Sequence, residues 1–322
     1  MILQTLNQWS RMGPRAMFGQ FMLELAKKNK DLIVISADLG RSSGLDRFKA
    51  AYPKQYLSVG ICEQNLIGVA SGLAREGYKV FVTSFAPFLS MRASEQIRMN
   101  LGYMKHPVNI IALGSGLSMG FLGNSHFGLE DTSIMRTIPG LNVFSPADNL
   151  ELKKIIFDLS TKKRGPTYVR LTGIPGSPLV YENDYKFDLF KPTLIHNGDD
   201  CLILSTGSIV GETKKAIKLL QKNNINPCLI NIHALKPLNV SYLKKFIKKY
   251  KFIITIEEHT ITNGLNSLII QNFIDEFKNN KKILNISLPD KFGPTGDYDY
   301  LLNYHGLNFN KIFLKIKKFL GS

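Results

Sequence analysis

The stretch Val59-Gly60-Ile61-Cys62-Glu63-Gln64-Asn65 gives the first indication of the fold. It leads into residues 64–75, where apolar side chains recur at the spacing of an amphipathic helix that ends near Gly77. Glu63 places a carboxylate at the start of this otherwise apolar helix, and two interpretations are open. The carboxylate can be a partner of the helix dipole, or it can be buried in its neutral form as a proton donor.

Outward from this helix, short apolar segments typical of strands alternate with segments of helical spacing. The expected strands are residues 32–36, 79–84, 108–113 and 167–171, then 201–205, 228–232, 252–256 and 283–288. The expected helices are residues 14–28, 64–75 and 91–101, one that begins at its N-cap Asp148, then 210–222, 241–249, 265–277 and 311–319. Such alternation predicts a parallel sheet covered on both faces. The predicted fold class is therefore α/β, with two domains that each contain a mostly parallel sheet flanked by helices.

A change in composition separates the two domains. Residues 173–197 contain Pro175, Pro178 and Pro192 together with several Gly, Asp and Asn residues, a mixture typical of loops. We therefore predict a first domain over residues 1–175, a linker over 176–196 and a second domain over 197–322. A chain of 322 residues is long enough for two domains.

Composition also indicates the cellular compartment of the protein. Hydrophobic residues make up 44% of the chain, enough to bury sizeable cores. The three cysteines, Cys62, Cys201 and Cys228, show no metal-binding spacing, which fits a reducing compartment. The N-terminus lacks the pattern of a signal peptide, and no uninterrupted run of about 18 apolar residues occurs. We expect a cytoplasmic location and no membrane partner.

The formal net charge is +16, which is compatible with a nucleic-acid-binding surface or with a lysine-rich solvated surface. Lysines in segments such as residues 243–249 sit between apolar residues at helical spacing, and no nucleic-acid-binding motif accompanies them. We therefore expect no nucleic-acid partner. A basic chain also attracts anionic sugar phosphates, or an acidic partner, by long-range steering.

The loop after the strand 108–113 is a candidate site, because ligands bind at the carboxyl ends of parallel strands. It contains Gly116-Leu117-Ser118-Met119-Gly120, which matches the G-x-S-x-G elbow of a hydrolase nucleophile. That elbow needs the serine on a tight strand-to-helix turn. Here the strand ends near Leu113 and no helix is expected directly after the motif. A glycine-lined substrate loop is the better interpretation.

His126 follows in the same loop and is, by pattern alone, either an ordinary polar residue or a site residue. The next residues with carboxylates are Glu130 and Asp131. They are candidates to cap the helix expected over 132–136.

Six ordered blocks of the sequence resemble the pyrimidine-binding and C-terminal domains of transketolases. The blocks are Ser36-Ala37-Asp38-Leu39, Gly60-Ile61-Cys62-Glu63-Gln64-Asn65, Ser84-Phe85-Ala86-Pro87-Phe88, the block from Ser125-His126 to Ile138-Pro139-Gly140, Gly165-Pro166-Thr167-Tyr168-Val169-Arg170, and Ile256-Glu257-Glu258-His259. They follow the family's order over nearly the whole chain. The ordered set is far more specific than any one block.

The resemblance implies a subunit of a thiamine diphosphate-dependent transferase that moves a two-carbon ketol unit from a ketose to an aldehyde or keto-sugar acceptor. Glu63 looks like the glutamate that hydrogen-bonds N1′ of the aminopyrimidine, a bond that a buried neutral carboxyl can donate. His126 resembles the histidine that contacts the donor's hydroxyls. The expected catalytic residues are therefore Glu63 and His126. The other implied cofactor contacts are Asp38, Leu39, Phe85, Phe88 and Met91, with the two aromatic rings packed on the pyrimidine. The other implied substrate contacts are Arg15, Ser42, Gly114, Leu122 and Ser125.

The resemblance also implies a second polypeptide. In this family the diphosphate and its divalent cation are held by a Gly-Asp-Gly motif and a later Asn on another domain, and no Gly-Asp-Gly occurs in this sequence. We therefore expect an N-terminal transketolase subunit as the partner, with the ligands for Mg²⁺ or Ca²⁺ on that partner and none on this chain. The expected assembly is α2β2, and activity is expected only in that assembly.

Four positions depart from the family pattern. Met91 replaces a tyrosine, Gly114 a histidine, Leu122 an aspartate and Gly173 an arginine. The loss of an arginine removes a charge-assisted phosphate contact of about 1.5–3 kcal/mol. Because the last three changes fall on the substrate side, we expect an acceptor other than the usual short aldose phosphate, such as a larger or less phosphorylated sugar.

Two other functions remain open. The β subunit of a 2-oxo-acid dehydrogenase has the same two-domain plan and a similar glutamate, although the block 36–39 and the Ser125-His126 block favour a transketolase. A non-catalytic regulatory subunit is an alternative of another class. Deoxyxylulose phosphate synthase is a weaker match, because it normally carries all three domains on one chain.

Overall fold

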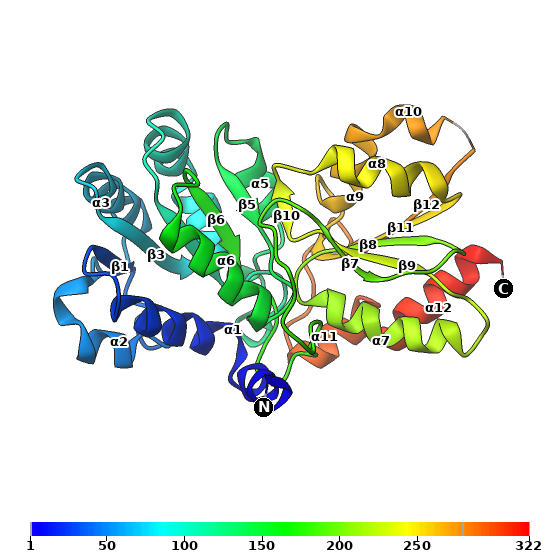
Figure 1. The fold of residues 1–322 in the computed structure, drawn as a ribbon, viewed down its shortest axis with the longest axis horizontal. Coiled ribbons are helices and arrows are strands. Elements are labelled where there is room, and N and C mark those ends of the chain that lie inside the picture. Colours follow the sequence, from blue (N-terminus) through cyan, green and yellow to red (C-terminus); the bar gives the residue numbers. More distant parts are fainter. Residues whose placement is uncertain (1, 279, 322) are drawn as a thin grey trace.

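The first domain is built on a mostly parallel sheet, seen at the left of Figure 1. The computed structural model describes residues 2–278 and 280–321, and within them this sheet has seven strands in the order β10-β5-β6-β4-β3-β1-β2. Their bounds are β1 (Leu32–Ser36), β2 (Tyr56–Ser58), β3 (Lys79–Phe85), β4 (Asn109–Leu113), β5 (Asn142–Phe144), β6 (Thr167–Arg170) and β10 (Ala234–Lys236). All neighbours pair in parallel except β10, which runs antiparallel to β5.

Alternating side chains along the strands explain why helices cover both faces. In β1, Leu32 and Val34 join the core formed with α1 (Ile2–Ala26), α2 (Asp46–Ala51) and α6 (Asn149–Thr161). Ile33 and Ile35 belong to the core on the other face, with α3 (Glu63–Arg75) and α5 (Asp131–Thr137). Helix α1 is interrupted at Gly13, and Pro14 opens its second part, as the sequence predicts.

The second domain is a smaller sheet of the same kind, at the right of Figure 1. In the part of the chain that the structure describes, its strand order is β12-β11-β8-β9-β7. The strands are β7 (Thr193–His196), β8 (Leu202–Ser205), β9 (Cys228–Asn231), β11 (Phe252–Thr260) and β12 (Lys282–Leu288). The helices are α7 (Ile209–Gln221), α8 (Val240–Lys249), α9 (Leu265–Asn272), α10 (Ile274–Phe277), α11 (Tyr298–Tyr304) and α12 (Phe309–Leu320). Strand β7 is antiparallel to β9 and the other pairs are parallel.

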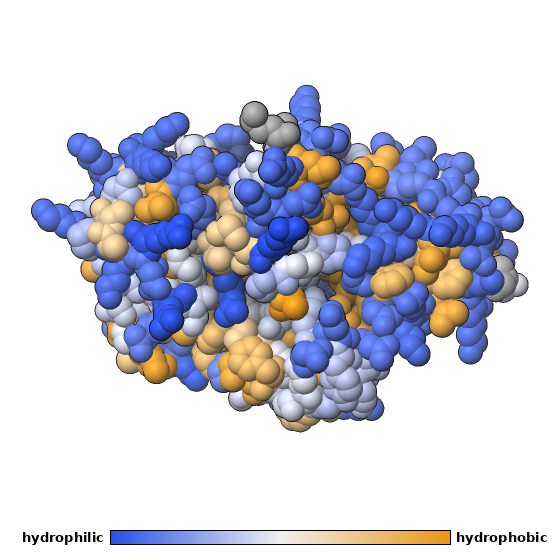
Figure 2. All heavy atoms as spheres, turned by 90° about the horizontal axis from the view of Figure 1, so that it is seen from below, coloured by the Kyte–Doolittle hydropathy of each residue, from blue (hydrophilic) through white to orange (hydrophobic). Residues whose placement is uncertain are grey.

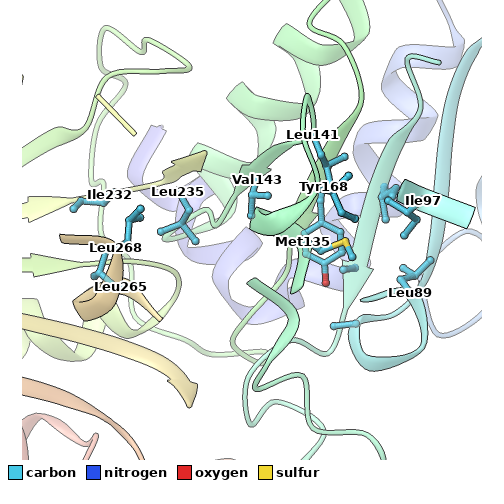
Figure 3. Close-up of a cluster of buried hydrophobic side chains, with 14 of the residues drawn as sticks. Leu89, Ile97, Met135, Leu141, Val143, Tyr168, Ile232, Leu235, Leu265 and Leu268 are labelled. Carbon is cyan, nitrogen blue, oxygen red and sulfur yellow. The ribbon is translucent and has the colours of Figure 1, made fainter. Parts of the chain in front are cut away.

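One apolar core continues from the first domain into the second, and Figure 3 shows part of it. Its members come from both sheets and from the helices between them. They include Met135, Val143 and Tyr168 on the first-domain side and Ile232, Leu235, Leu265 and Leu268 on the second-domain side. Burial of this shared apolar surface holds the two domains in a fixed relation.

These observations confirm the predicted α/β class and the two mostly parallel sheets, with three local differences. Strand β10 comes from the second domain but completes the first sheet. Strand β7 lies inside residues 176–196, the predicted linker, so that segment ends in the second sheet. The helix expected over 91–101 consists instead of wide π-helical turns, η2 (Phe88–Arg92) and η3 (Ile97–Tyr103), around the short α4 (Ser94–Gln96).

The surface is mainly hydrophilic, as a lysine-rich chain requires. Figure 2 shows charged and polar side chains over most of the face seen from below, with smaller apolar areas between them. Among the helices of the described residues, none has the length and apolar character needed to cross a lipid bilayer.

Candidate active site

Glu63 is the first residue of α3, and its side chain is buried, with 1% of its surface exposed. Both carboxylate oxygens accept hydrogen bonds. The Ser84 hydroxyl, from β3, donates to Oε1 at 2.8 Å, and Arg92 Nη1 donates to Oε2 at 2.6 Å. Burial of this carboxylate is therefore compensated by an ion pair. Sequence reasoning missed Arg92, although it stands four residues after Phe88 in the block that carries the resemblance.

The aromatic residues named from the sequence lie together, and one of them, Phe88, is linked to Glu63 through Arg92. Phe85 ends β3 and Phe88 begins η2, and their ring centroids are 6.0 Å apart in an edge-to-face arrangement. The ring of His126 lies 5.5 Å from that of Phe85 and 5.2 Å from that of Phe88. The structure thus joins two predicted cofactor contacts to the predicted catalytic histidine. Ser125 Oγ contacts His126 Nδ1 at 3.0 Å.

The other predicted cofactor contacts lie at the same sheet edge. Asp38 and Leu39 follow the carboxyl end of β1, and the Leu39 amide donates to Ser36 Oγ at 2.8 Å. Asp38 has a φ of 58°, in the left-handed region that non-glycine residues seldom occupy, a strain often found at functional sites. Met91 is in η2 with 46% of its surface exposed, beside Arg92.

The glycine-rich loop after β4 is folded back on itself rather than into a nucleophile elbow. The Gly116 amide donates to the Gly128 carbonyl at 2.8 Å, and the Gly128 amide returns a bond at 3.2 Å. The Ser118 hydroxyl donates to the Ser115 carbonyl at 3.0 Å. A 3-10 helix, η4 (Gly120–Ser125), follows the motif instead of an α-helix, so the hydrolase geometry is not formed.

The second domain fixes this loop in place. Glu258, in β11, is buried and accepts from the Leu117 amide at 2.5 Å and from the Tyr298 hydroxyl at 2.6 Å. Burial raises the pKa of Glu258. Arg170 of β6 donates to the carbonyls of Gly128 at 3.1 Å and of Glu258 at 3.0 Å. These contacts tie the loop to both domains.

Asp131 does not cap α5, contrary to one interpretation of the sequence. No side chain caps that helix. Instead Asp131 Oδ2 accepts from Arg170 Nε at 3.0 Å and from the Tyr168 hydroxyl at 3.0 Å, and both charged groups are buried. A buried arginine without an anion costs more free energy than a helix end without a cap, which explains why Asp131 pairs with Arg170.

A cavity of about 300 Å³ opens next to the loop. Its lining includes two predicted substrate residues, Arg15 and Ser42, together with Gly173, Ser118 and Arg41. Burial lowers the pKa of Arg15. Arg41 was not singled out from the sequence, although it adjoins Ser42.

The remaining predicted substrate residues are Gly114, Leu122 and Ser125, and they lie outside the lining of this cavity. Gly114 has a φ of 67°, and a Cβ there would stand 2.5 Å from Met119 Cγ. The histidine of the family pattern therefore does not fit at 114 unless Met119 moves. Leu122 is exposed on η4.

Comparison with known proteins agrees with this geometry. The transketolase pyrimidine-binding domain family matches residues 11–173, and the transketolase C-terminal domain family matches residues 191–312. The chain belongs to the transketolase family. Among its relatives is a Methanocaldococcus jannaschii protein described as a transketolase C-terminal section, 36% identical over 94% of this chain and 95% of the relative. A subunit of the apulose-4-phosphate transketolase of Phocaeicola vulgatus is 32% identical over 91% of this chain and 93% of its own length.

A solved structure of a split gene transketolase, described as an inactive beta4 tetramer, has the same fold. Its TM-score is 0.83, its identity is 30%, and the match covers 95% of this chain and 97% of that one. The transketolase family depends on thiamine diphosphate, and the residues present fit the pyrimidine half of that cofactor: a buried carboxylate, and a pair of aromatic rings linked to it through Arg92. Within residues 2–278 and 280–321, no three His, Cys, Asp or Glu side chains are grouped to hold a metal ion.

Proposed function

We propose that this chain is the pyrimidine-binding subunit of a split transketolase, active in two-carbon ketol transfer once paired with a diphosphate-binding partner. The observation that carries the proposal is Glu63, a buried carboxylate at the carboxyl edge of the first sheet that is paired with Arg92, which in turn packs on Phe88. Thiamine diphosphate, when bound, supplies the carbon centre that accepts and releases the two-carbon unit.

The roles of this chain's residues follow from their surroundings. Glu63 holds a proton between its carboxyl and N1′ of the pyrimidine, and burial strengthens that bond by excluding water. Phe85 and Phe88 give the pyrimidine an apolar packing surface. Because Ser125 contacts Nδ1 of His126, we assign Nε2 to the hydroxyls of the donor sugar. The other residues proposed to contact the pyrimidine are Asp38, Leu39 and Met91.

The partner is proposed to supply the half of the site that binds the diphosphate. We propose an N-terminal transketolase subunit that holds the diphosphate and Mg²⁺ or Ca²⁺, in an α2β2 assembly in the cytoplasm. Helix α3 offers a surface for assembly, since Gly68 and Gly72, one turn apart, are exposed with open space where a Cβ would stand. Small residues at this spacing allow another helix to approach closely. The domain limits 1–175 and 197–322 remain part of this proposal.

Reconstitution with the partner tests the function. The purified pair, given thiamine diphosphate and Mg²⁺, is expected to transfer a two-carbon unit from a ketose phosphate to an aldehyde, and each subunit alone is expected to show no turnover. Product formation is followed by mass spectrometry with a ¹³C-labelled donor. Turnover of pyruvate with a lipoyl acceptor, and none of the ketose, would instead identify a 2-oxo-acid dehydrogenase.

The cavity beside Gly173 supports a substrate with a terminal anionic group. Arg41 and Arg15 line the same space, so a positive charge remains there although residue 173 is a glycine. An arginine at 173 would be strained, because φ is 83° and its Cβ would lie 2.8 Å from Ser177 Oγ. The P. vulgatus relative is named for a sugar 4-phosphate. We therefore propose a phosphorylated sugar whose phosphate meets Arg15, Arg41 and Ser42, with an acceptor other than the usual short aldose phosphate.

Arg41→Ala tests this assignment. Loss of one arginine–phosphate contact, about 1.5–3 kcal/mol, is expected to raise KM for the phosphorylated substrate by tenfold or more with kcat little changed. The matched control is Arg47→Ala, an exposed arginine of α2. An unchanged KM in Arg41→Ala would favour a substrate without a phosphate at this position.

A further inference from the structure

Arg92 makes two contacts at once in the candidate site. Its Nη1 lies 2.6 Å from Glu63 Oε2, and its guanidinium carbon lies 4.3 Å from the centroid of the Phe88 ring. The guanidinium is flat, carries N–H donors and packs well on an aromatic face. It therefore joins the carboxylate of α3 to the aromatic ring of η2.

A pyrimidine ring in this site would need the same two contacts. In the proposed function, the heterocycle packs on Phe88 and shares a hydrogen bond with Glu63. The guanidinium and the pyrimidine are both flat nitrogen-bearing groups, and the guanidinium already lies over the Phe88 ring with its Nη1 at Glu63 Oε2. A heterocycle that packs on the same ring face next to Oε2 would overlap it, so the two groups compete for that space.

We infer that Arg92 is an internal substitute for the cofactor's aminopyrimidine: it contacts Glu63 and Phe88 and must swing out when thiamine diphosphate binds. This inference rests on the proposed function. The side chain can leave at small cost, because 46% of it is exposed and its charged end can reach water. Glu63, at 1% exposure, cannot follow it. The pair therefore keeps a buried carboxylate compensated until the cofactor takes the place of the arginine.

Arg92 is thus a competitor of the cofactor, and its removal should strengthen cofactor binding. Arg92→Met removes the competitor and leaves Glu63 without its cation only in the unloaded state. The assembled pair should then bind thiamine diphosphate more tightly, with Kd lowered about tenfold, because binding no longer breaks the ion pair. A residue that only stabilises the fold would leave Kd unchanged, and one that holds the bound cofactor would raise it.

Isothermal titration of thiamine diphosphate with Mg²⁺ into the assembled pair measures this directly. Arg92→Gln, which keeps a flat end without the charge, is measured beside Arg92→Met. Arg98→Met, an exposed arginine of η3 outside the site, is the matched control and should bind like the wild type.

A lower Kd in either Arg92 variant supports the inference. An unchanged or higher Kd overturns it while leaving the proposed function in place. Failure of both Arg92 variants to assemble, when Arg98→Met assembles, also overturns it, because a side chain displaced on loading is not needed in the loaded complex. If the wild-type pair itself binds no thiamine diphosphate, the proposed function fails, and this inference fails with it.

Discussion

Glu63→Gln in the assembled pair is expected to lower kcat by about 10³-fold or more while the complex still forms. Proton transfer by a positioned side chain typically contributes 10²–10⁴-fold. The amide keeps the shape of the side chain but cannot exchange a proton with N1′ of the pyrimidine. KM for the ketose should change little, since Glu63 is proposed to contact the cofactor rather than the sugar.

The measurement is steady-state turnover together with partner binding by size-exclusion chromatography. Glu95→Gln is the matched control, because Glu95 is an exposed carboxylate in α4, within the same irregular segment as Arg92. A non-catalytic regulatory subunit predicts no loss of turnover in Glu63→Gln. Full activity in this variant would therefore reject the catalytic assignment, whereas loss of assembly would point to a structural role for the Glu63–Arg92 pair.

The sequence was sufficient for the elements that carry their own signal. Strands such as β1 and β4 are runs of buried apolar residues, and their limits could be predicted to within a residue or so. Short strands were missed where pairing, not composition, defines them. Ala234–Lys236 becomes β10 only because β5 lies opposite it. Strand β7, at the end of the predicted linker, was missed for the same reason, since it is defined by its pairing with β9.

The candidate site also contains residues that the sequence predicts and one that it does not. Phe85, Phe88 and His126 were named from sequence blocks, and the structure brings their rings together. Arg92 was not named, because the contact with Glu63 joins residues 29 positions apart. It also depends on the wide π-helical turn over Phe88–Arg92, where a regular helix was expected at 91–101. Such turns are frequent at functional sites, but helical periodicity does not reveal them.

Arg170→Met is expected to lower the free energy of unfolding by about 3–5 kcal/mol, because it leaves Asp131 as an uncompensated buried charge. Arg170 and Asp131 are 1% and 0% exposed at their side chains, with Nε 3.0 Å from Oδ2. The variant also loses the bonds to the carbonyls of Gly128 and Glu258 that tie the glycine loop to the second domain. Denaturant titration followed by circular dichroism measures the change.

Two further variants distinguish the effect of the uncompensated buried charge from the effect of lost packing in Arg170→Met. The double variant Asp131→Asn with Arg170→Met removes both charges and should recover part of the loss. Arg164→Met breaks a more exposed pair with Asp158 and should cost about 1 kcal/mol or less. A loss of stability in Arg170→Met no larger than that in Arg164→Met would contradict the role assigned to the buried pair.

Because Gly128 is hydrogen-bonded to Gly116, removal of the Arg170 side chain is also expected to make the loop that precedes His126 less ordered. The activity of the assembled Arg170→Met variant should therefore fall even at temperatures where the chain stays folded.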